Sequence, residues 1–541
     1  MMRSSPGNSP SFPPAVFFQI VAWEGHARAA AQAVSASANL SCGADALHFA
    51  CHLAPWGFQS FDQATYMHWN GFFAALLFVN DWEYTRNATT ARKLTLPLLA
   101  GLNAWSHCYL QEVPGGGGSY VFLDYVAASP DEEHEGQKVP NPQIGLALML
   151  RVARAHVEIG AALGVKVPGY VSDIVAHLPP PNVCLTHVPS AAPAPGPVPS
   201  GFFALEAATR CSADYHMGKE ATLAACEQGC YEDATCGAFT FCNGTVSSTP
   251  AGRCAGAGAK PAGQPSCWRY AGTALTCSGG AAGFTSGVRS GGNSSNATVQ
   301  VWTAFANATV RQSDNFALYP SWPSETVDAI DTRATDSATR AVAARSSQVY
   351  SKLVSDRPVL VFSAAVRGLG LSAEGIVAGL NGWLAKAEGA NFVPSAPGGG
   401  TENVGVTQAV NDMLVQAPGG RYIVLFPVWP KAEPASFERL RTKGGFLVSA
   451  TWDNATRAVA TTTTAAAAAA ATALHGGTTA AVTIEATAED CTSCTLQAPW
   501  GSGTALAVSC GGVSVAIAVD RDRVSWPMKR GDVCTVLPAA E

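Results

Sequence analysis

The sequence predicts a mainly α chain that carries a small disulfide-rich insert and ends in an antiparallel β-sandwich. Amphipathic helical patterns fill residues 19–178 and return after residue 300. Eight of the 16 cysteines fall within residues 211–277, and from residue 421 onward the apolar residues alternate instead of recurring at helical spacing. A chain of 541 residues has room for about two to four domains.

The helical segments are identified by apolar residues at three- and four-residue steps. In one segment these residues are Leu94, Leu98, Leu102, Trp105 and Tyr109. In another, Asn141 suits the N-cap and Pro142 the first helical position. The spacing predicts helices over 66–84, 91–110, 141–163, 334–353, 372–387 and 407–416. Successive amphipathic helices joined by loops predict helical hairpins packed side by side.

The C-terminal part carries the strand signal. Short β-branched and aromatic runs predict strands over 422–426, 445–448, 482–484 and 513–519. An antiparallel sandwich of roughly 100 residues would hold them.

Composition sets the predicted domain boundaries. A Pro-rich linker precedes the Cys-rich block, and a Gly/Ser/Asn-rich linker follows it. The predicted divisions are a first helical part at 19–178, the linker at 179–200, the Cys-rich insert at 201–290, a second helical part at 291–420 and the sandwich at 421–541.

The cysteines predict disulfides and an oxidising compartment. The insert is expected to use Cys211, Cys226, Cys230, Cys236, Cys242, Cys254, Cys267 and Cys277. A second even-numbered set near the C-terminus comprises Cys491, Cys494, Cys510 and Cys534. Seven glycosylation sequons agree with a secreted or lumenal protein. The N-terminus shows no signal peptide, so we expect the chain to lack its true start.

Several classes of function are excluded by what the sequence lacks. The net charge is −6 and there is no Lys/Arg run, which argues against a nucleic-acid partner. No stretch of 18 residues is apolar enough to predict a membrane span. No H-E-x-x-H is present, and Cys491-x2-Cys494 is better explained by disulfides, so no metal is expected. The Gly runs at 115–118 and 398–400 lack the Lys-Ser/Thr of a phosphate loop, and no cofactor is expected.

The most informative motif is an acidic loop between a Gly-rich turn and a helix. Ser129-Pro130 is followed by Asp131, Glu132, Glu133, His134 and Glu135. General acid chemistry on a sugar needs a carboxyl group near other carboxylates, so that its pKa rises. The alternative interpretation is a solvated acidic loop.

Several strings together resemble glycoside hydrolase family 95, whose known activities are α-L-fucosidase and α-L-galactosidase. The strings are HLAPWG with DQATYMHWNG (52–71), NAWSHCYL (103–110), SPDEEHEG before the NPQIG helix, DNFALYPSWPSE (314–325), NVGVTQAVNDMLVQ (403–416) and LFPVWPKAEPASFERLRTKGGFLVSA (425–450). They cover residues 50–178 and 310–540. The resemblance implies an (α/α)6 toroid of six helical hairpins and hydrolysis of a terminal fucose- or galactose-like residue.

The resemblance also implies site residues, with departures from the family. The family acid is the Glu of an SPE-like motif; here Asp131 or Glu132 occupies that place, and Glu402 is the best substitute for the base. The large N-terminal β-sandwich and the Asn-x-Asn motif of the family are not found. The expected substrate-binding residues are Trp56, Asp62, Gln63, Tyr66, His68, Trp69, Asn70, His134 and Asn403. For the aromatic residues a core position, and for the histidines a structural role, remain open alternatives.

The Cys-rich block resembles a PAN/apple domain through CEQGCYEDATCGAFTFC and CWRY. Such domains bind proteins or carbohydrates, so this insert is expected to do the same. Two functions follow as expectations. The first is a secreted glycosidase acting on an oligosaccharide or glycoconjugate by carboxylate acid/base catalysis. The second is an inactive carbohydrate- or protein-binding extracellular protein.

Overall fold

The computed structural model describes residues 24–37, 40–49, 68–112, 118, 120–121, 123–126, 137–188, 317–330, 335–350, 358–368, 370–384, 406–430, 432–453, 458–460, 481–500 and 505–538, and the strands between residues 203 and 302. The chain divides into two compact units. Unit 1 comprises Met1–Pro181, Leu318–Ser347 and Asp356–Glu541, and unit 2 comprises Asn182–Ala317 and Gln348–Ser355.

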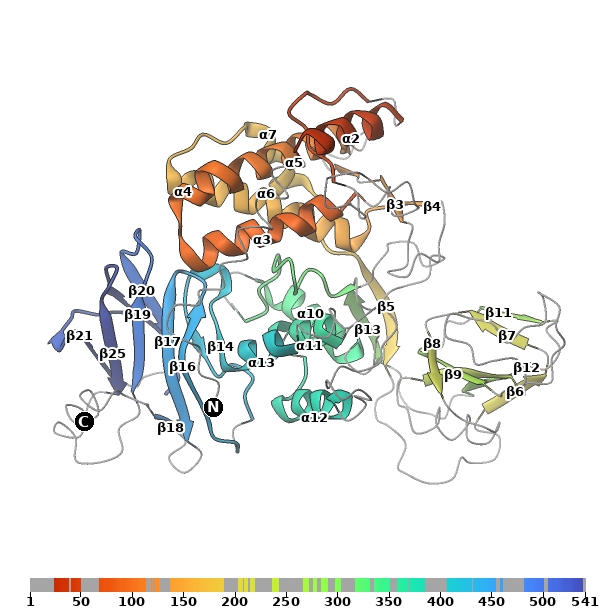
Figure 1. Cartoon of the computed structure of the whole chain (residues 1–541). Coiled ribbons are helices and arrows are strands. Elements are labelled where there is room, and N and C mark those ends of the chain that lie inside the picture. The colour runs from red at the N-terminus through yellow and green to blue at the C-terminus, as the bar shows by residue number, and fades with distance from the viewer. Residues whose placement is uncertain are drawn as a thin grey trace. The chain divides into compact units, whose positions relative to one another are not determined.

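A first group of helices opens unit 1 (Figure 1). Its members are α2 (Glu24–Ser37), α3 (Asn70–Thr85), α4 (Ala88–Thr90), the π-helical turn η2 (Ala91–Thr95), α5 (Leu96–Tyr109), α6 (Gln143–Leu163) and α7 (Gly169–His177). The Asn87 side chain accepts a hydrogen bond from the Thr90 backbone N–H and so caps α4. Their core contains Phe72, Phe78, Leu99, Leu102, Trp105 and Leu148, each essentially fully buried. The short hairpins β1 (Gln111–Glu112) with β2 (Tyr120–Val121) and β3 (Leu123–Val126) with β4 (Gln137–Pro140) lie between α5 and α6 in the sequence.

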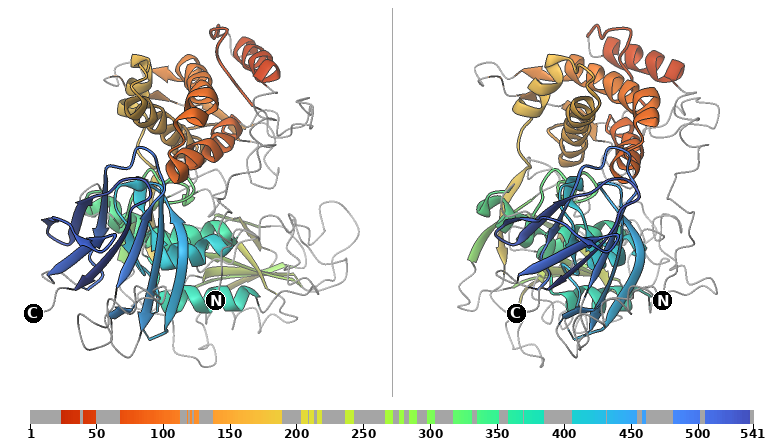
Figure 2. Two further views of the ribbon diagram at one scale, coloured as in Figure 1. Left: turned by 60° about the vertical axis from the view of Figure 1, so that its left-hand side comes forward. Right: turned by 90° about the vertical axis from the view of Figure 1, so that its left-hand side faces the viewer.

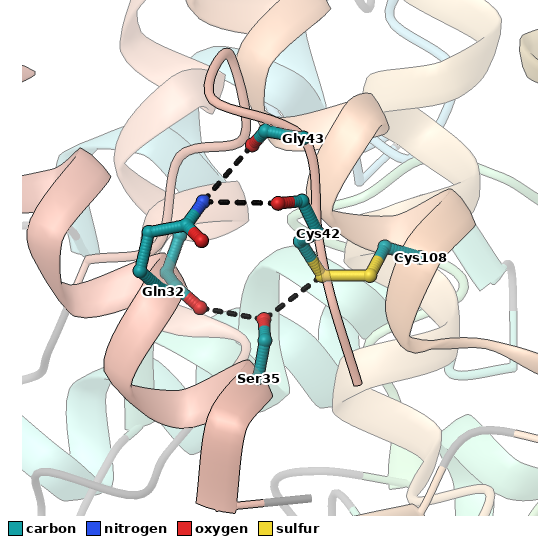
Figure 3. Close-up of a disulfide and its surroundings, with 6 residues drawn as sticks. Gln32, Ser35, Cys42, Gly43 and Cys108 are labelled. Carbon is teal, nitrogen blue, oxygen red and sulfur yellow. Dashed lines mark hydrogen bonds between the residues drawn. A yellow bond between two sulfur atoms is a disulfide. The ribbon is translucent and has the colours of Figure 1, made fainter. Parts of the chain in front are cut away.

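A disulfide ties the segment after α2 to α5 (Figure 3). Cys42 pairs with Cys108 across 66 positions of sequence. Gln32 on α2 donates from Nε2 to the carbonyls of Cys42 and Gly43, at 3.1 Å each, and Ser35 Oγ contacts the Cys42 sulfur. This bond and the one in the sandwich described below confirm that the chain forms disulfides.

A second group of helices lies later in unit 1, and only the last three residues of its first helix belong to unit 2. The group comprises α10 (Ser337–Tyr350), α11 (Pro358–Gly368), α12 (Ala373–Leu384) and α13 (Val406–Leu414). Asp336 caps α10 by accepting from the backbone N–H groups of Ala338 and Thr339 at 2.9 Å each. The last three helices share an apolar core made of Phe362, Val366, Ile376, Leu380, Ala409, Met413 and Val428.

The C-terminal part of unit 1 is a sandwich of two antiparallel sheets (Figure 1; Figure 2). The larger sheet has the order β16-β17-β19-β25-β21-β22, with β18 also paired to β17. Its strands are β16 (Ala435–Thr442), β17 (Phe446–Asp453), β18 (Ala458–Ala460), β19 (Val482–Ala486), β21 (Leu506–Cys510), β22 (Val513–Ser514) and β25 (Val533–Pro538). The smaller sheet joins β20 (Ser493–Gln497), β24 (Arg523–Pro527) and β23 (Ala518–Asp520). A two-stranded pair, β14 (Val415–Gln416) and β15 (Val424–Leu425), and the 3-10 turn η5 (Pro418–Gly420) connect α13 to it.

Alternate residues of these strands fill the sandwich core. In β19 the buried positions are Val482, Ile484 and Ala486, which face the same side because the side-chain period of a strand is two. They pack in one cluster with Trp452, Leu496 and Trp526 from both sheets. Cys510 and Cys534 stand opposite each other on β21 and β25 and form the second disulfide.

Apart from the last turn of α10, most of the described residues of unit 2 form antiparallel strands. One sheet has the order β6-β12-β9-β10-β8, and two further pairs are β11-β7 and β13-β5. The strands are β5 (Val183–Val188), β6 (Phe203–Ala207), β7 (Thr209–Ser212), β8 (Tyr215–Gly218), β9 (Cys236–Cys242), β10 (Ser266–Ala271), β11 (Thr276–Gly279), β12 (Phe284–Arg289) and β13 (Ala297–Trp302).

The prediction of a mainly α chain built on an (α/α)6 toroid is wrong. The part of the chain that the structure describes contains fewer helices than six helical hairpins require, and several antiparallel sheets stand beside them. The reason is physical. Helical periodicity shows that each helix has one apolar face, and that face is buried equally well against another hairpin or against a mixed set of helices and strands.

One turn of the sandwich requires glycine at position 445. Gly445 has a φ of +80°, and a Cβ added there would lie 2.5 Å from the Cβ of Ala488. Gly445→Ala is therefore expected to lower the free energy of unfolding by about 2–4 kcal/mol, from backbone strain together with overpacking. Urea unfolding followed by circular dichroism measures this loss.

Gly511→Ala is the matched control for this substitution. Gly511 also has a positive φ, +58°, but no heavy atom of the described residues lies within 4 Å of its added Cβ. Its expected loss is about 1–2 kcal/mol, from the backbone alone. Equal losses in the two variants would show that the contact with Ala488 adds no cost.

Candidate functional site

Six charged side chains form a continuous buried series in unit 1, which we call the charge chain: Arg151, Glu83, Lys443, Glu325, Arg367 and Asp412. Arg151 Nη2 lies 2.5 Å from Glu83 Oε1, and Lys443 Nζ lies 2.8 Å from Glu83 Oε2 and also contacts Glu325 Oε2. Arg367 Nη2 lies 3.0 Å from Glu325 Oε1, and its Nη1 lies 2.6 Å from Asp412 Oδ2. All six side chains are at most 17% exposed.

Each member of the charge chain comes from a different element. Glu83 lies on α3, Arg151 on α6, Arg367 on α11 and Asp412 on α13, while Glu325 lies in the turn before α10. Lys443 lies in the turn between β16 and β17, where the Gly444 N–H donates to the Glu83 carbonyl at 2.7 Å. Three cations face three carboxylates, so the charges balance as burial requires.

A pocket of about 660 Å³ lies against the charge chain. Five of the six members line it, all except Glu83. Its other walls include Tyr84, Arg154, Thr442 and Gln416. A volume of this size is within the usual range for small-molecule sites, about 300–1,000 Å³.

The two pocket carboxylates that Arg367 contacts, Asp412 and Glu325, have pKa values moved in opposite directions. Burial raises the pKa of Asp412 to about 6, although Arg367 opposes that rise. Burial would also raise the pKa of Glu325, but Lys443, Arg367 and Arg151 outweigh it and lower the pKa to about 2. Asp412 therefore takes up a proton at about pH 6, where Glu325 stays ionised.

One guanidinium fixes the spacing of these two carboxylates. Arg367 Nη2 lies 3.0 Å from Glu325 Oε1 and 3.1 Å from Asp412 Oδ1. These two oxygens are thus no farther apart than two hydrogen-bond lengths. Gln408 Nε2 donates to the same Asp412 oxygen at 2.9 Å and fixes that carboxylate further.

The structure places the predicted residue His68 in a buried aromatic cluster and not in the pocket. His68 Nδ1 lies 2.9 Å from His48 Nε2, and its Nε2 lies 3.1 Å from the Tyr109 hydroxyl. His48 and His68 are 1% and 2% exposed. Trp105 stacks on Tyr109 with ring centroids 4.7 Å apart.

Two other predicted binding residues follow His68 at the start of α3. Trp69 is the N-cap residue and meets Phe73 edge to face, and Asn70 is the first helical residue. His68, Trp69 and Asn70 thus lie together, but none of them lines the pocket.

The remaining predicted site residues lie outside the described residues: Trp56, Asp62, Gln63, Tyr66, Asp131, Glu132, His134, Glu402 and Asn403. The disulfide predictions for Cys226, Cys230 and Cys254 lie outside them as well, and the side chains of Cys211, Cys236, Cys242, Cys267 and Cys277 are not described.

At the C-terminus one disulfide prediction is wrong. Cys491 and Cys494 remain free thiols, while Cys510 and Cys534 pair. The strand register explains the choice, because it sets Cys510 directly opposite Cys534, whereas Cys494 is buried on β20 opposite Trp526.

Within the described residues no group of His, Cys, Asp and Glu side chains is arranged to hold a metal ion. Among the same residues no helix has both the length and the apolar character needed to cross a membrane.

Sequence reasoning did not single out Glu325, Asp412 or Lys443, although a signal for Asp412 was available. Ala409, Asp412 and Met413 on α13, and Gln416 on β14 directly after it, follow at three- and four-residue steps, and all four are buried. A carboxylate on an otherwise buried helix face needs a partner, and this indicates a buried charged site.

No protein-family model matches this chain, and no match is found among curated proteins. The function therefore has to be argued from the site itself.

Proposed function

We propose that the chain is a glycoside hydrolase in which Asp412 supplies the proton and Glu325 the ionised carboxylate. The observation that supports the proposal is the pair itself: two carboxylates on one guanidinium, at the wall of a pocket, with pKa values moved apart. Acid/base catalysis at a glycosidic bond usually relies on such a pair of carboxyl groups.

In the proposed mechanism, Asp412 donates its proton to the glycosidic oxygen as the bond to the anomeric carbon breaks. Ionised Glu325 stabilises the positive charge that develops at that carbon, or forms a bond to the carbon that breaks again, with Glu325 leaving as a carboxylate, when water adds. Water then adds its hydroxyl to the sugar and returns a proton to Asp412.

The sequence suggests the sugar that is cleaved, and the disulfides suggest the compartment in which the protein acts. The resemblance to glycoside hydrolase family 95 suggests a terminal fucose- or galactose-like residue of an oligosaccharide or glycoconjugate. The two disulfides support a secreted or lumenal location. Asp131 or Glu132, with Glu402, remain the alternative carboxylates.

The test uses leaving groups, because a general acid matters most when the leaving group is poor. Asp412→Asn is expected to slow hydrolysis of methyl α-L-fucoside and α-L-galactoside by at least about a hundredfold. It should have much less effect on the 2,4-dinitrophenyl glycosides, whose leaving group needs no proton. Glu325→Ala should be inactive on both and recover with added azide, which replaces the missing carboxylate.

The controls separate loss of catalysis from loss of folding. Glu489→Gln, at an exposed position, should keep full activity, and circular dichroism checks that each variant is folded. Full activity in a folded Asp412→Asn would overturn this assignment. Activity lost in Glu132→Gln or Glu402→Gln instead would move the site to the loops predicted from sequence.

One observation favours a second candidate, a protein that binds glycans without cleaving them. Asp412 makes a bidentate pair with Arg367, and its Oδ1 is also bonded by Gln408, which restrains it as a proton donor. Titration calorimetry with fucose and galactose would detect binding, and binding without turnover would support this candidate. The PAN/apple-like region would then be a second binding element for a protein or glycan.

A further inference from the structure

The pocket carries more positive charge than its carboxylates neutralise. Seven cationic and four acidic side chains line it. Three of the cations, Arg151, Arg367 and Lys443, form ion pairs within the charge chain. A fourth, Arg421, pairs with Asp328 at 3.0 Å. This leaves Arg86, Arg154 and Arg441, none of which has a carboxylate at ion-pairing distance among the described residues.

The contacts of these three arginines are with neutral groups. Arg154 Nη1 donates to the Thr326 carbonyl at 2.8 Å, and Arg441 Nη1 donates to Thr487 Oγ1 at 2.9 Å. The Arg86 guanidinium lies over the Trp82 ring, 5.2 Å from its centroid. Burial lowers the pKa of Arg154 and of Arg441, and it outweighs the opposing charges of Glu158 and Glu485, respectively.

Two hydrogen-bond donors at the pocket wall have no partner in the part of the chain that the structure describes. They are the buried Nε of Arg441 and the hydroxyl of Thr442, a residue that is only 3% exposed. Both residues line the pocket. Leaving such donors unsatisfied is costly, so their presence beside a cavity points to a ligand that accepts hydrogen bonds.

We propose that this pocket takes an acidic sugar, whose carboxylate or sulfate ester is held by Arg154, Arg441 and Thr442. Planar guanidinium groups recognise both anions through paired N–H donors, and the hydroxyl of Thr442 adds one more. The uncharged part of the sugar then remains for the Asp412 and Glu325 side of the same pocket. The inference rests on the proposed glycosidase function for its substrate, although the binding itself does not require catalysis.

The experiment measures binding, not turnover. Titration calorimetry at constant ionic strength compares galacturonate, galactose 6-sulfate, inorganic sulfate and galactose with the full chain. The two acidic sugars should bind at least about tenfold more tightly than galactose, which corresponds to one charge-assisted contact. A preference for galacturonate identifies a carboxylate site, and a preference for galactose 6-sulfate a sulfate site.

Variants assign the contacts. Arg154→Gln and Arg441→Gln should each weaken the acidic sugar about tenfold and leave galactose unchanged. Thr442→Val removes one hydroxyl at nearly constant volume and should weaken it by a smaller factor. Arg530→Gln, an exposed arginine outside the pocket, is the matched control.

The outcomes separate this inference from the proposed function. Equal affinity for galactose and galacturonate, or acidic-sugar binding that survives both arginine substitutions, would overturn it. Tight inorganic sulfate binding with no gain from the sugar would reduce the site to a simple anion site and also overturn it. Acidic-sugar binding without hydrolysis would uphold it while the glycosidase proposal fails.

Discussion

Replacing Lys443 with Met is expected to lower the free energy of unfolding by about 3–5 kcal/mol. Lys443 is 7% exposed at its side chain, and its ammonium is the one group that contacts both Glu83 and Glu325 in the described charge chain. Met fills nearly the same space but leaves two buried carboxylates with one cation fewer. Urea unfolding at pH 7.5 measures the change.

The matched control is Arg530→Met, which breaks an ion pair at the surface. Arg530 and Glu489 are 60% and 77% exposed, so their loss should change stability by no more than about 1 kcal/mol. Adding Glu83→Gln to Lys443→Met should recover part of the loss, because it removes an uncompensated charge. A Lys443→Met variant as stable as the control would show that the charge chain contributes little.

Acidification should destabilise the chain between about pH 6.5 and 4 through two buried histidines. Burial lowers the pKa of His48 and of His156 from 6.5 to about 4. The unfolded chain therefore takes up protons at these groups at a higher pH than the folded chain does. Their stabilisation is complete above pH 6.5 and is lost as the pH falls toward 4, on the order of 2–3 kcal/mol for each histidine.

Protonation of Asp412 stabilises the folded chain in part of this pH range, which is opposite to the effect of the two histidines. Its pKa is raised to about 6 in the folded chain, so protonating it as the pH falls from 6 toward 3.8 favours folding. Destabilisation should thus be steepest at about pH 6 to 5.5, and it should be shallower toward pH 4 than it would be without Asp412. Glu325, with its pKa lowered to about 2, adds to the loss only below pH 4.5.

Urea midpoints measured across pH 7.5–4 test this pattern. His156→Gln keeps an acceptor for the Asn103 amide, which lies 3.2 Å from His156 Nδ1, and should flatten the profile. His48→Gln should do the same, and His177→Gln at an exposed position serves as the control. An unchanged profile in both buried-site variants would contradict the assignment.

Several helices and strands lie where the sequence predicted them, because local structure depends on near neighbours. The helix predicted at 141–163 is α6 at Gln143–Leu163, and the strand predicted at 482–484 lies within β19. Gly164 ends α6 in the left-handed conformation, with φ +64°.

The assembly of these elements was not predictable in the same way. Periodicity shows that a helix has a buried face but not what covers it, and the toroid prediction failed for that reason. The charge chain joins residues as distant as Glu83 and Lys443, and no local pattern links them. His68 lies buried beside His48 and Tyr109, which is the structural position that the sequence left open as the alternative to a sugar contact.

The turn that carries Lys443 contacts the early helices only after most of the chain has been synthesised. Arg441, beside it, hydrogen-bonds the Tyr84 carbonyl across 357 positions of sequence. At about 5–20 residues per second, the ribosome would take roughly 20 to 70 seconds to make the intervening chain. During that interval Glu83 has only Arg151 as a cationic partner within the charge chain. The early helices are therefore expected to stay loosely folded, and open to chaperones, until the sandwich emerges.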